Sequence, residues 1–315
     1  MEKALVVGAG LVGSLQAVLL AKKGHQVDVY DRRGDIRNVE FIGGRSINLA
    51  LSNRGWKALE LAGIAQDIKD ISIPMTGRKM HAVNGDITYQ AYGKEGEAIY
   101  SVPRGELNRK LILKAAEHEN VNLHFDMKCT DIDVKKGSVS FEDAKSGEKV
   151  ITEATQIYGT DGAFSSVRAR LQKTDRFNYS QEYLRHGYKE LIIPANEDGS
   201  HKMDKNALHI WPRGEFMLIA LANLDGSFTV TLFFPFEGET SFASLDTDAK
   251  ILAFFEETFA DAVPLMPTLL KDYHENPSAS LVIIRCDPWN YEDKVLLMGD
   301  SAHAIVPFYG QGMNS

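Results

Sequence analysis

Cysteine is scarce in this sequence, which limits the kinds of site that it can hold. The 315 residues include only Cys129 and Cys286, which lie far apart and outside any metal-ligand spacing. A disulfide framework needs more cysteines than this, and a zinc site needs several ligands at short spacings. The histidines form no HxxxH-type cluster either. We therefore expect neither a metal site nor a disulfide framework.

Long apolar runs and an excess of positive charge are also lacking. No apolar run approaches the ~20 residues that span a bilayer, and Leu5–Val7 lacks the basic flank and long apolar core of a signal peptide. The formal net charge of −8 disfavours nucleic acid as a partner. We expect a cytoplasmic protein with no membrane segment and no nucleic-acid partner. These features leave the oligomeric state open.

The most informative stretch is the N-terminal one. Lys3–Val7 is almost entirely apolar, which is typical of a strand buried on both faces of a parallel sheet. Gly8–Gly13 follows directly as a GxGxxG motif, and Leu11–Lys23 carries apolar residues at helical spacing. Gln26–Tyr30 resembles a second strand, with Asp31 at its end. The order strand, glycine turn, helix, strand and acid predicts a nucleotide-binding unit.

Each position of this unit has a physical reason. Gly8 makes the tight turn, Gly10 lets backbone N–H groups approach a pyrophosphate, and Gly13 lets the helix pack closely on the strand. The helix N-terminus attracts the anion, and Asp31 accepts hydrogen bonds from an adenosine ribose. A lone GxGxxG is weak evidence, but this context favours dinucleotide binding over a simple glycine-rich turn. The motif does not separate FAD from NAD.

The rest of the chain alternates between two kinds of pattern. Arg78–Val83 and Asp86–Tyr92 flank an Asn-Gly turn and predict a hairpin, and Arg104–His118 is typical of a helix. Four later segments are rich in β-branched and aromatic residues and predict an antiparallel sheet in a second domain: Tyr188–Ile193, Ala207–Trp211, Phe216–Ala222 and Phe228–Phe234.

Two further acids stand at the ends of predicted strands. Thr155–Gly159 leads into Asp161, and Val295–Met298 leads into Asp300. The carboxyl ends of parallel strands are where ligands bind in open α/β sheets. Both carboxylates are therefore candidates for contact with the same dinucleotide.

The glycine unit and the two strand-end acids together resemble the single-component FAD-dependent aromatic hydroxylases. Three longer strings, Gly44–Ser52, Leu208–Arg213 and His303–Asn314, narrow the resemblance to members that hydroxylate kynurenine. The resemblance covers essentially the whole chain. It implies an α/β fold: a Rossmann-type FAD-binding domain with a parallel sheet (residues 1–73, 99–174 and 280–315), and an inserted antiparallel-sheet substrate domain (74–98 and 175–279).

The same resemblance implies the chemistry. FAD is bound, NADPH reduces it, and O2 then forms a flavin C4a-hydroperoxide that hydroxylates L-kynurenine to 3-hydroxy-L-kynurenine. This is a step of tryptophan degradation that leads towards NAD biosynthesis. The residues themselves fit this scheme, because the sequence offers no metal and no obvious nucleophile–base pair, so the cofactor must carry the reaction. We therefore assign no catalytic side chain. Nor is there a second GxGxxG to hold NADPH.

The resemblance also assigns substrate contacts. Arg78 matches the residue that pairs with the kynurenine carboxylate, a role that suits a guanidinium fork, and Tyr92 matches its hydroxyl partner. Phe308 and Tyr309 match a loop beside the flavin. Apolar positions lining the ring pocket match four residues, for which ordinary sheet core is the alternative: Leu208, Met217, Leu221 and Phe233.

Contacts with FAD are expected from the glycine unit, the strand-end acids and the positions that match the family. For Arg104 and Asn108 the alternative is a simple helix start, and for Asp300 a strand-end cap. The full set is Gly8, Gly10, Leu11, Val12, Gly13, Tyr30, Asp31, Arg32, Arg33, Ala50, Arg104, Asn108, Cys129, Asp161, Asp300, Gly312, Met313 and Asn314.

One departure from the family concerns length. Family members continue beyond the position of Asn314 with helices that cover the substrate site, so the resemblance predicts a C-terminally shortened chain. Two alternatives remain: a flavin hydroxylase of another aromatic acid, and a flavin-binding fragment without productive turnover. A flavin-dependent halogenase is disfavoured, because no Trp-x-Trp-x-Ile-Pro string occurs.

Overall fold

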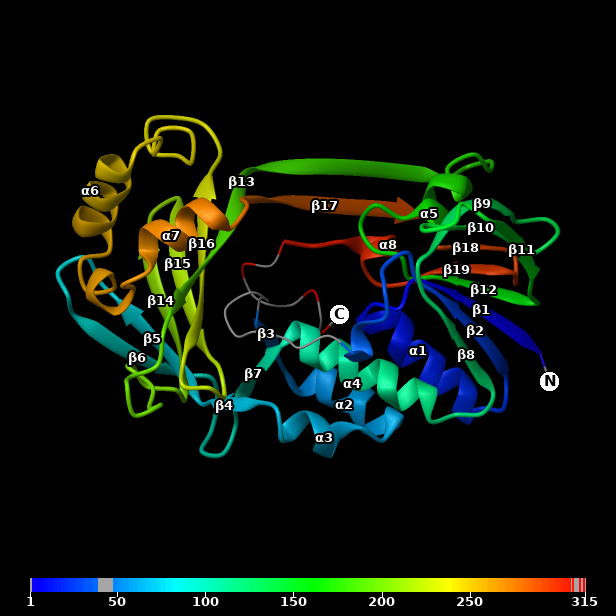
Figure 1. Cartoon of the computed structure of the whole chain (residues 1–315), viewed down its shortest axis with the longest axis horizontal. Helices are drawn as coiled ribbons and strands as arrows, with labels where there is room; N and C mark the ends of the chain where they lie inside the picture. The colour runs from blue at the N-terminus through cyan, green and yellow to red at the C-terminus, as the bar shows by residue number, and fades with distance from the viewer. Residues whose placement is uncertain (1, 39–47, 307, 309–311, 313, 315) are drawn as a thin grey trace.

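The computed structural model describes residues 2–38, 48–306, 308, 312 and 314. The chain forms two halves, and a long two-stranded ribbon joins them along one side (Figure 1). One half is built on a parallel sheet covered by helices, and the other on a mainly antiparallel sheet. This arrangement confirms the α/β fold class that the sequence predicted.

The first half is organised around its central strand, β1. The six strands lie in the order β18 (Asn290–Tyr291), β19 (Val295–Leu297), β12 (Gln156–Gly159), β1 (Lys3–Val7), β2 (Gln26–Tyr30) and β8 (Val121–His124). Strand β1 pairs in parallel with β12 on one side and β2 on the other. It therefore has no free edge and no exposed face, which explains its nearly unbroken apolar sequence.

Different elements cover the two faces of this sheet. Ala4 and Val6 pack into a core with three helices, α1 (Leu11–Lys22), α2 (Asn53–Ala62) and α4 (Arg104–Ala116). Leu5 and Val7 face the opposite way, towards α5 (Ser166–Leu171) and the three-stranded sheet of β9 (Met127–Asp133), β10 (Ser138–Asp143) and β11 (Lys149–Glu153). Both faces of β1 are thus core.

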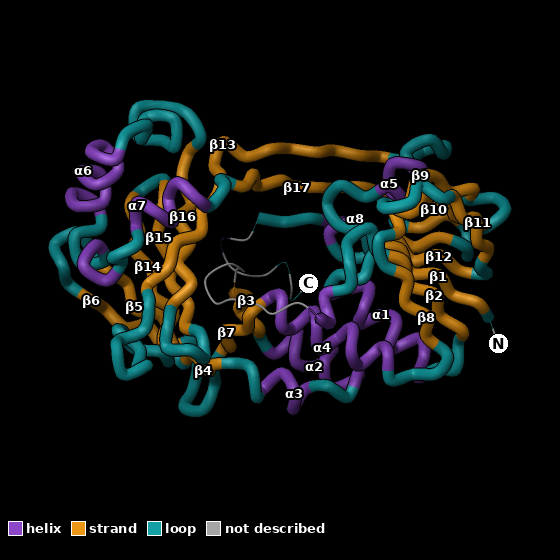
Figure 2. The backbone as a smooth tube through the Cα atoms, in the orientation of Figure 1, coloured by secondary structure: helices purple, strands orange, loops and turns teal. Residues whose placement is uncertain are grey.

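The second half is a seven-stranded sheet with one core face. Its strands lie in the order β17 (Ala279–Asp287), β13 (Asn178–Ile193), β16 (Phe228–Pro235), β15 (Phe216–Ala222), β14 (Ala207–Arg213), β5 (Gly77–His81) and β6 (Ile87–Ala91). Helices α6 (Asp248–Thr258) and α7 (Leu269–Glu275) cover one face, in a core that includes Trp211, Leu218 and Phe255. The other face is turned towards the first half (Figure 2). The predicted Asn-Gly hairpin is confirmed as β5 and β6.

Strands β13 and β17 form the ribbon that joins the halves. Strand β13 is 16 residues long, whereas the sequence predicted a strand only over Tyr188–Ile193. Its first six residues, Asn178–Tyr183, are exposed, so they carry no alternation of apolar and polar residues that would reveal a strand. The register against β17 shifts between Tyr183 and Gly187, where the ribbon enters the large sheet.

A small sheet lies at the junction on the opposite side. It consists of β3 (Asn48–Leu51), β7 (Ile99–Pro103) and β4 (Ile73–Met75), with a short helix, α3 (Ala65–Lys69), next to it in the chain. Asn48 Nδ2 donates to Ala222 O (3.2 Å) and Asn223 Oδ1 (2.7 Å), and Ser101 Oγ donates to Ala222 O (2.9 Å). These bonds tie the two halves together.

The predicted domain boundaries stay a prediction. They fall within β4 and β17, at the start of β7, and just before β13, which are the segments by which the chain passes between the halves. Within the described part of the chain, none of the helices has the length and apolar character needed to cross a bilayer.

Candidate active site

Two glycines of the N-terminal motif are required by close packing. Gly8 has φ of 104°, and a Cβ there would lie 2.6 Å from Thr160 O. A Cβ on Gly13 would lie 1.8 Å from Gly8 O and 2.5 Å from Thr160 Oγ1. Thr160 Oγ1 in turn contacts Val7 O (2.9 Å) and Gly8 O (2.8 Å), so it braces the turn. The turn geometry therefore excludes larger side chains at both positions.

Gly10 differs from the other two because it faces open space. A Cβ there would meet no described atom within 4 Å. Gly10 is also the N-cap of α1, whose first turn carries no acidic residue and no side-chain cap in the part of the chain described. The first N–H groups of a helix need a partner, and with the helix dipole they attract an anion. This cradle fits the pyrophosphate of a dinucleotide such as FAD.

Asp31 closes the same loop from the end of β2. Its buried carboxylate accepts hydrogen bonds from Ala9 N (2.7 Å) and from Arg33 N (2.8 Å), Nε (3.0 Å) and Nη2 (3.0 Å). Burial by itself would raise the pKa of Asp31, but the Arg33 and Ala9 bonds outweigh it and the pKa is lowered. Asp31 is therefore an ionised acceptor beside the glycine loop. Arg32 is exposed next to it.

Helix α4 supports the loop from the other side. Asn108 Nδ2 donates to Ala9 O (3.1 Å), while its buried Oδ1 has no hydrogen-bond partner in the described structure. Because a buried acceptor without a partner is costly, this oxygen is suited to a donor from a ligand. Arg104 begins the same helix.

Asp161 lies in a hydrogen-bond network that links the ends of β12 and β19. Asp161 accepts hydrogen bonds from Ser165 Oγ (2.5 Å) and Ser166 N (2.6 Å), and so caps α5. Ser301 Oγ reaches Asp161 Oδ1 (3.2 Å) and accepts from Gly162 N (2.9 Å). The buried Arg168 donates to Ser301 O (2.8 Å) and to Ala163 O. The segments that follow β12 and β19 are therefore locked together.

Asp300 lies where the two halves approach one another. Asp300 is the first residue of α8 (Asp300–His303) and is exposed. Desolvation by the surrounding protein nevertheless raises the pKa of its carboxyl group, and the charges of Arg104 and His303 oppose this rise. Arg104 also lowers the pKa values of Tyr188 and Glu190 on β13, against a larger rise caused by burial. Arg104 thus stands between charged and polar groups of both halves.

The five predicted substrate residues on the large sheet share one face. Arg78 on β5 pairs with Leu208 on β14, Met217 on β15 pairs with Phe233 on β16, and Leu221 follows Met217 at even spacing. Residues paired across strands point to the same side. The opposite face carries Trp211, Leu218, Ala220 and Leu232, which belong to the core under α6 and α7. We call the side with the five residues the site face.

Arg78 and Tyr92 form the polar end of the site face. The Arg78 guanidinium carbon lies 5.8 Å from the centroid of the Tyr92 ring, and Arg78 Nε is buried with no hydrogen-bond partner among the described residues. Burial raises the pKa of Tyr92 to about 12, with Arg78 opposing the rise. The phenol is therefore a neutral donor beside a cation that forms no ion pair within the described part of the chain, and together they suit a carboxylate.

Phe308, near the C-terminal end of the sequence, lies against the site face. Its ring lies 5.2 Å from that of Phe233, at an interplanar angle of 73°. Asn314 Nδ2 donates to Ala50 O (2.9 Å), and its Oδ1 accepts from Ser52 N (2.9 Å), so this end of the chain is fastened to β3. Gly312 is exposed. Tyr309 and Met313, predicted for the substrate and cofactor respectively, lie outside the described residues.

Two predicted cofactor residues have side chains that are engaged within the protein. The Tyr30 ring stacks on His124 (4.2 Å) and Phe141 (4.0 Å), and its carbonyl accepts from Gly8 N (2.7 Å). Cys129 is buried in the same core, and burial raises the pKa of its thiol to about 12. Tyr30 could contact a cofactor only through the edge of its ring or its backbone, and Cys129 only through its backbone.

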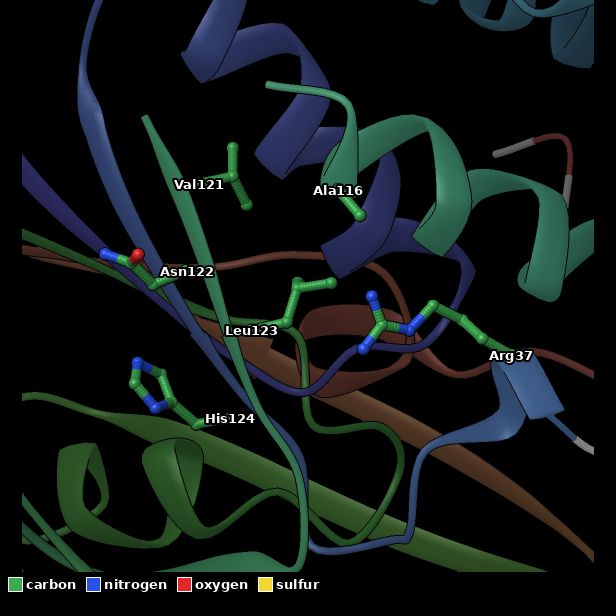
Figure 3. Close-up of a pocket in the computed structure, with 6 residues that line it drawn as sticks. All are labelled: Arg37, Ala116, Val121, Asn122, Leu123 and His124. Carbon is green, nitrogen blue, oxygen red and sulfur yellow. The ribbon is translucent and has the colours of Figure 1, made fainter. Parts of the chain in front are cut away.

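A shallow hollow lies away from this constellation, at the outer edge of the parallel sheet (Figure 3). Leu123 of β8 points towards Arg37, whereas Asn122 and His124 project from the other side of the strand (Figure 3). Arg37 is already paired with Asp35 (2.6 Å). The hollow contains none of the predicted site residues, and we assign it no role.

Sequence reasoning missed several residues that build the site. The sequence did not predict that Thr160 braces the glycine turn. It also did not predict that Ser301 and Arg168 hold the segments after β12 and β19 together. Tyr188 and Glu190 were assigned only to a strand. The alternation along β13 would have placed both on one face, but which face they share depends on pairing with β16.

Comparison with known proteins gives the class. Residues 1–315 match the family described as FAD binding domain. The tetrameric form of 2-methyl-3-hydroxypyridine-5-carboxylic acid oxygenase shares the fold, with a TM-score of 0.78 at 20% identity over 100% of this chain and 79% of that one. The fold and the glycine cradle define a flavoprotein of the FAD binding domain family.

Relatives with higher sequence identity identify the family more narrowly. Kynurenine 3-monooxygenase of Flavobacterium psychrophilum is 53% identical over 314 residues, which cover 100% of this chain and 70% of that protein. The enzyme of the same name from Dictyostelium discoideum is 50% identical over 311 residues, 98% of this chain and 66% of that protein. The chain belongs to the kynurenine 3-monooxygenase family.

Proposed function

We propose that this protein hydroxylates L-kynurenine to 3-hydroxy-L-kynurenine, with FAD as its bound cofactor and NADPH and O2 as co-substrates. The observation that carries the proposal is the site face. Arg78, whose buried Nε has no hydrogen-bond partner among the described residues, stands at its polar end, and apolar side chains from neighbouring strands continue from it. Kynurenine has the complementary form, a carboxylate at one end and an aromatic ring at the other.

The residues of the polar end bind and orient the substrate. The Arg78 guanidinium takes the carboxylate, and Tyr92 donates its hydroxyl proton to the same group. Because the pKa of Tyr92 is about 12, this donor keeps its proton throughout the neutral range. Two donors at one end fix which way the amino acid lies on the sheet.

The apolar part of the site face holds the ring and excludes water. Leu208, Met217, Leu221 and Phe233 form its wall, and Phe308 closes against Phe233. Exclusion of water strengthens electrostatic contacts and suppresses side reactions of reactive oxygen species. When bound and reduced by NADPH, FAD supplies the oxygen chemistry, so no side chain is required as a base.

The first half would hold FAD through the features predicted from the sequence. The N–H groups at Leu11 and Val12 would hold the pyrophosphate and Asp31 the ribose, and Arg104, Asp161 and Asp300 would supply the further contacts predicted from the sequence. We also propose a cytoplasmic location, which the free thiols of Cys129 and Cys286 support.

The test uses the purified protein and its visible spectrum. We expect a yellow protein that releases FAD on denaturation, and NADPH oxidation that rises when L-kynurenine is added, with 3-hydroxykynurenine as product. Stimulation by 4-hydroxybenzoate instead of kynurenine would point to a hydroxylase of another aromatic acid. A protein that binds FAD but gives no hydroxylated product with either compound would be a flavin-binding chain without turnover.

A further inference from the structure

A buried pair of histidines lies on the sheet face opposite the site face. His81 ends β5 and His209 lies on β14, and both side chains are almost completely buried. His81 Nδ1 is 2.8 Å from Asp261 Oδ2, and His81 Nε2 is 2.9 Å from His209 Nδ1. His209 Nε2 is 2.9 Å from Asp204 O. The two rings thus form a chain of three polar contacts between a carboxylate and a backbone carbonyl.

This chain needs more protons than two neutral rings possess. A carboxylate and a carbonyl are both acceptors, so each end contact needs a ring N–H, and the contact between the rings needs a third. Two neutral imidazoles carry one N–H each. If both rings were neutral, one of the three contacts would set two lone pairs against each other at about 2.8–2.9 Å. The cluster therefore holds one additional proton.

The position of that proton follows from the charges. The carbonyl of Asp204 requires His209 to carry its proton on Nε2, so its Nδ1 accepts from His81 Nε2. His81 Nδ1 then donates to Asp261. Placed on His81, the extra proton puts the imidazolium directly against its counter-ion. Loss of the proton would leave the Asp261 carboxylate, which is partly exposed and also interacts with Arg213, facing an uncharged ring.

We infer that His81 is held as a buried imidazolium between Asp261 and His209, and that this proton fixes the strand that carries Arg78. The second part rests on the proposed function. Arg78 and His81 lie on the same five-residue strand, and Leu208 and His209 are adjacent on the strand that pairs with it. Arg213 Nη1 also donates to His81 O (2.8 Å). His81 is accordingly a positioning residue for the carboxylate end of the site.

Other charged groups also face the cluster. Trp211 Nε1 donates to both oxygens of Asp261 (3.0 and 2.8 Å), and its ring stacks on His81 at 4.1 Å. Lys79, paired with Asp204 (2.9 Å), and Arg213 both disfavour positive charge on His81. Burial lowers the pKa of each ring, that of His209 to about 4, with Asp261 opposing the effect at His81 and Asp204 O at His209.

Burial and the hydrogen-bond count act in opposite directions on the protonation of His81. The count decides, because two neutral rings would leave one of the three short contacts without a hydrogen, and the two rings titrate as a unit. The low pKa of His209 describes uptake of a further proton, which would give two adjacent cations. The proton on His81 instead makes the cluster neutral overall, and burial favours a neutral cluster.

The decisive variant is Asp261→Asn. The amide would still accept from Trp211 through its oxygen and would donate to His81 Nδ1 through its nitrogen, so two neutral rings would satisfy all three contacts. Asp248→Asn is the matched control, because Asp248 contacts His274 at 2.7 Å in an exposed pair. Nitrogen-15 NMR of the ring nitrogens in FAD-loaded protein reports the protonation state directly. At about pH 7.5, where a free imidazole is mostly neutral, we expect both His81 nitrogens protonated in wild type and in Asp248→Asn, and one in Asp261→Asn.

The coupling to the site is read from kynurenine binding between pH 6 and 9. The dissociation constant of wild type should rise about tenfold more than that of Asp261→Asn as His81 loses its proton. A neutral His81 in wild type at about pH 7.5 would overturn the inference, and so would parallel pH profiles of the two proteins. If kynurenine binds neither protein at any pH, the proposed function fails and the ring spectra still decide the state of His81. If Asp261→Asn does not fold, the wild-type spectra and the Asp248→Asn profile remain decisive.

Discussion

At the scale of single residues, Arg78 has an unusual combination of properties. Its Nε is buried and unpartnered among the described residues, and its neighbour Tyr92 is a neutral phenol. We predict that Arg78→Met weakens kynurenine binding by roughly 2–4 kcal/mol, the scale for losing one member of a desolvated charge pair. The FAD content should stay normal, because Arg78 lies outside the glycine loop. Calorimetric titration of the FAD-loaded variant measures this.

The matched control for Arg78 is the next residue of the same strand. Lys79 points to the opposite face, where it pairs with Asp204 at 2.9 Å. Lys79→Met removes a positive charge of the same strand and should leave kynurenine affinity within about twofold, since partly exposed pairs contribute little. Equal losses in the two variants would indicate a general effect of charge, and an unchanged Arg78→Met would remove Arg78 from the site.

Tyr92 gives a prediction about pH. Its pKa of about 12 means that the hydroxyl is protonated, and so a donor, at every pH from 6 to 10. Tyr92→Phe should therefore weaken kynurenine binding by about 0.5–1.5 kcal/mol, the worth of one hydrogen bond, and by the same amount across this range. Titrations at both ends of the range test it. A loss that vanishes at the alkaline end would mean that Tyr92 ionises there.

At the scale of elements, the glycine turn separates folding from binding. A Cβ at position 10 meets open space, whereas one at position 13 would overlap Gly8 O. Gly10→Val should keep the melting temperature of the apoprotein but abolish FAD retention, because its side chain fills the approach to the helix N-terminus. Gly13→Ala should lower stability by about 1–3 kcal/mol or more through overpacking. Thermal melts of the apoproteins, with flavin content measured separately, distinguish the two effects.

The elements also show what local sequence determines. Strand β1, helix α1, the hairpin and helix α4 were predictable because each carries a local signal: an unbroken apolar run in β1, an Asn-Gly turn in the hairpin, and apolar residues at helical spacing in the two helices. The first part of β13 was not, because a ribbon exposed on both faces imposes no period on its side chains. Its extended conformation comes from pairing with β17, about a hundred residues later in the chain.

The candidate site was predictable only in part. The glycine turn and Asp31 lie within one local unit, so the motif specifies their geometry. Arg78 and Leu208 face one another because β5 and β14 happen to pair, and nothing in either segment encodes that register. The family resemblance supplied these residues, and the structure places them on one face. Asp261, His81 and His209 escaped notice because three separate segments bring them together.

At the scale of the whole molecule, the two halves should unfold together. Besides the ribbon, Asn48 and Ser101 bond to Ala222 and Asn223 across the junction. We predict that the double variant Asn48→Ala/Ser101→Ala loses about 1–3 kcal/mol, the worth of a few buried hydrogen bonds. Its near- and far-ultraviolet dichroism transitions should separate, whereas those of wild type coincide.

The control for this prediction is a surface amide. Asn290 Nδ2 donates to Glu292 O within one exposed turn, away from the junction. Asn290→Ala should keep coincident transitions and a melting temperature close to wild type. Coincident transitions in the double variant as well would mean that the ribbon alone is enough to couple the halves.

The three tryptophans give the molecule an optical property that follows from where they lie. Trp56 belongs to the helices of the first half, Trp289 to the end of the ribbon, and Trp211 stacks on His81. A protonated imidazole quenches indole emission more strongly than a neutral one. With Trp56 and Trp289 replaced by Phe in apoprotein, the remaining emission should brighten as pH rises through the pKa of His81. The fluorescence of Trp211 would then report the protonation state of His81.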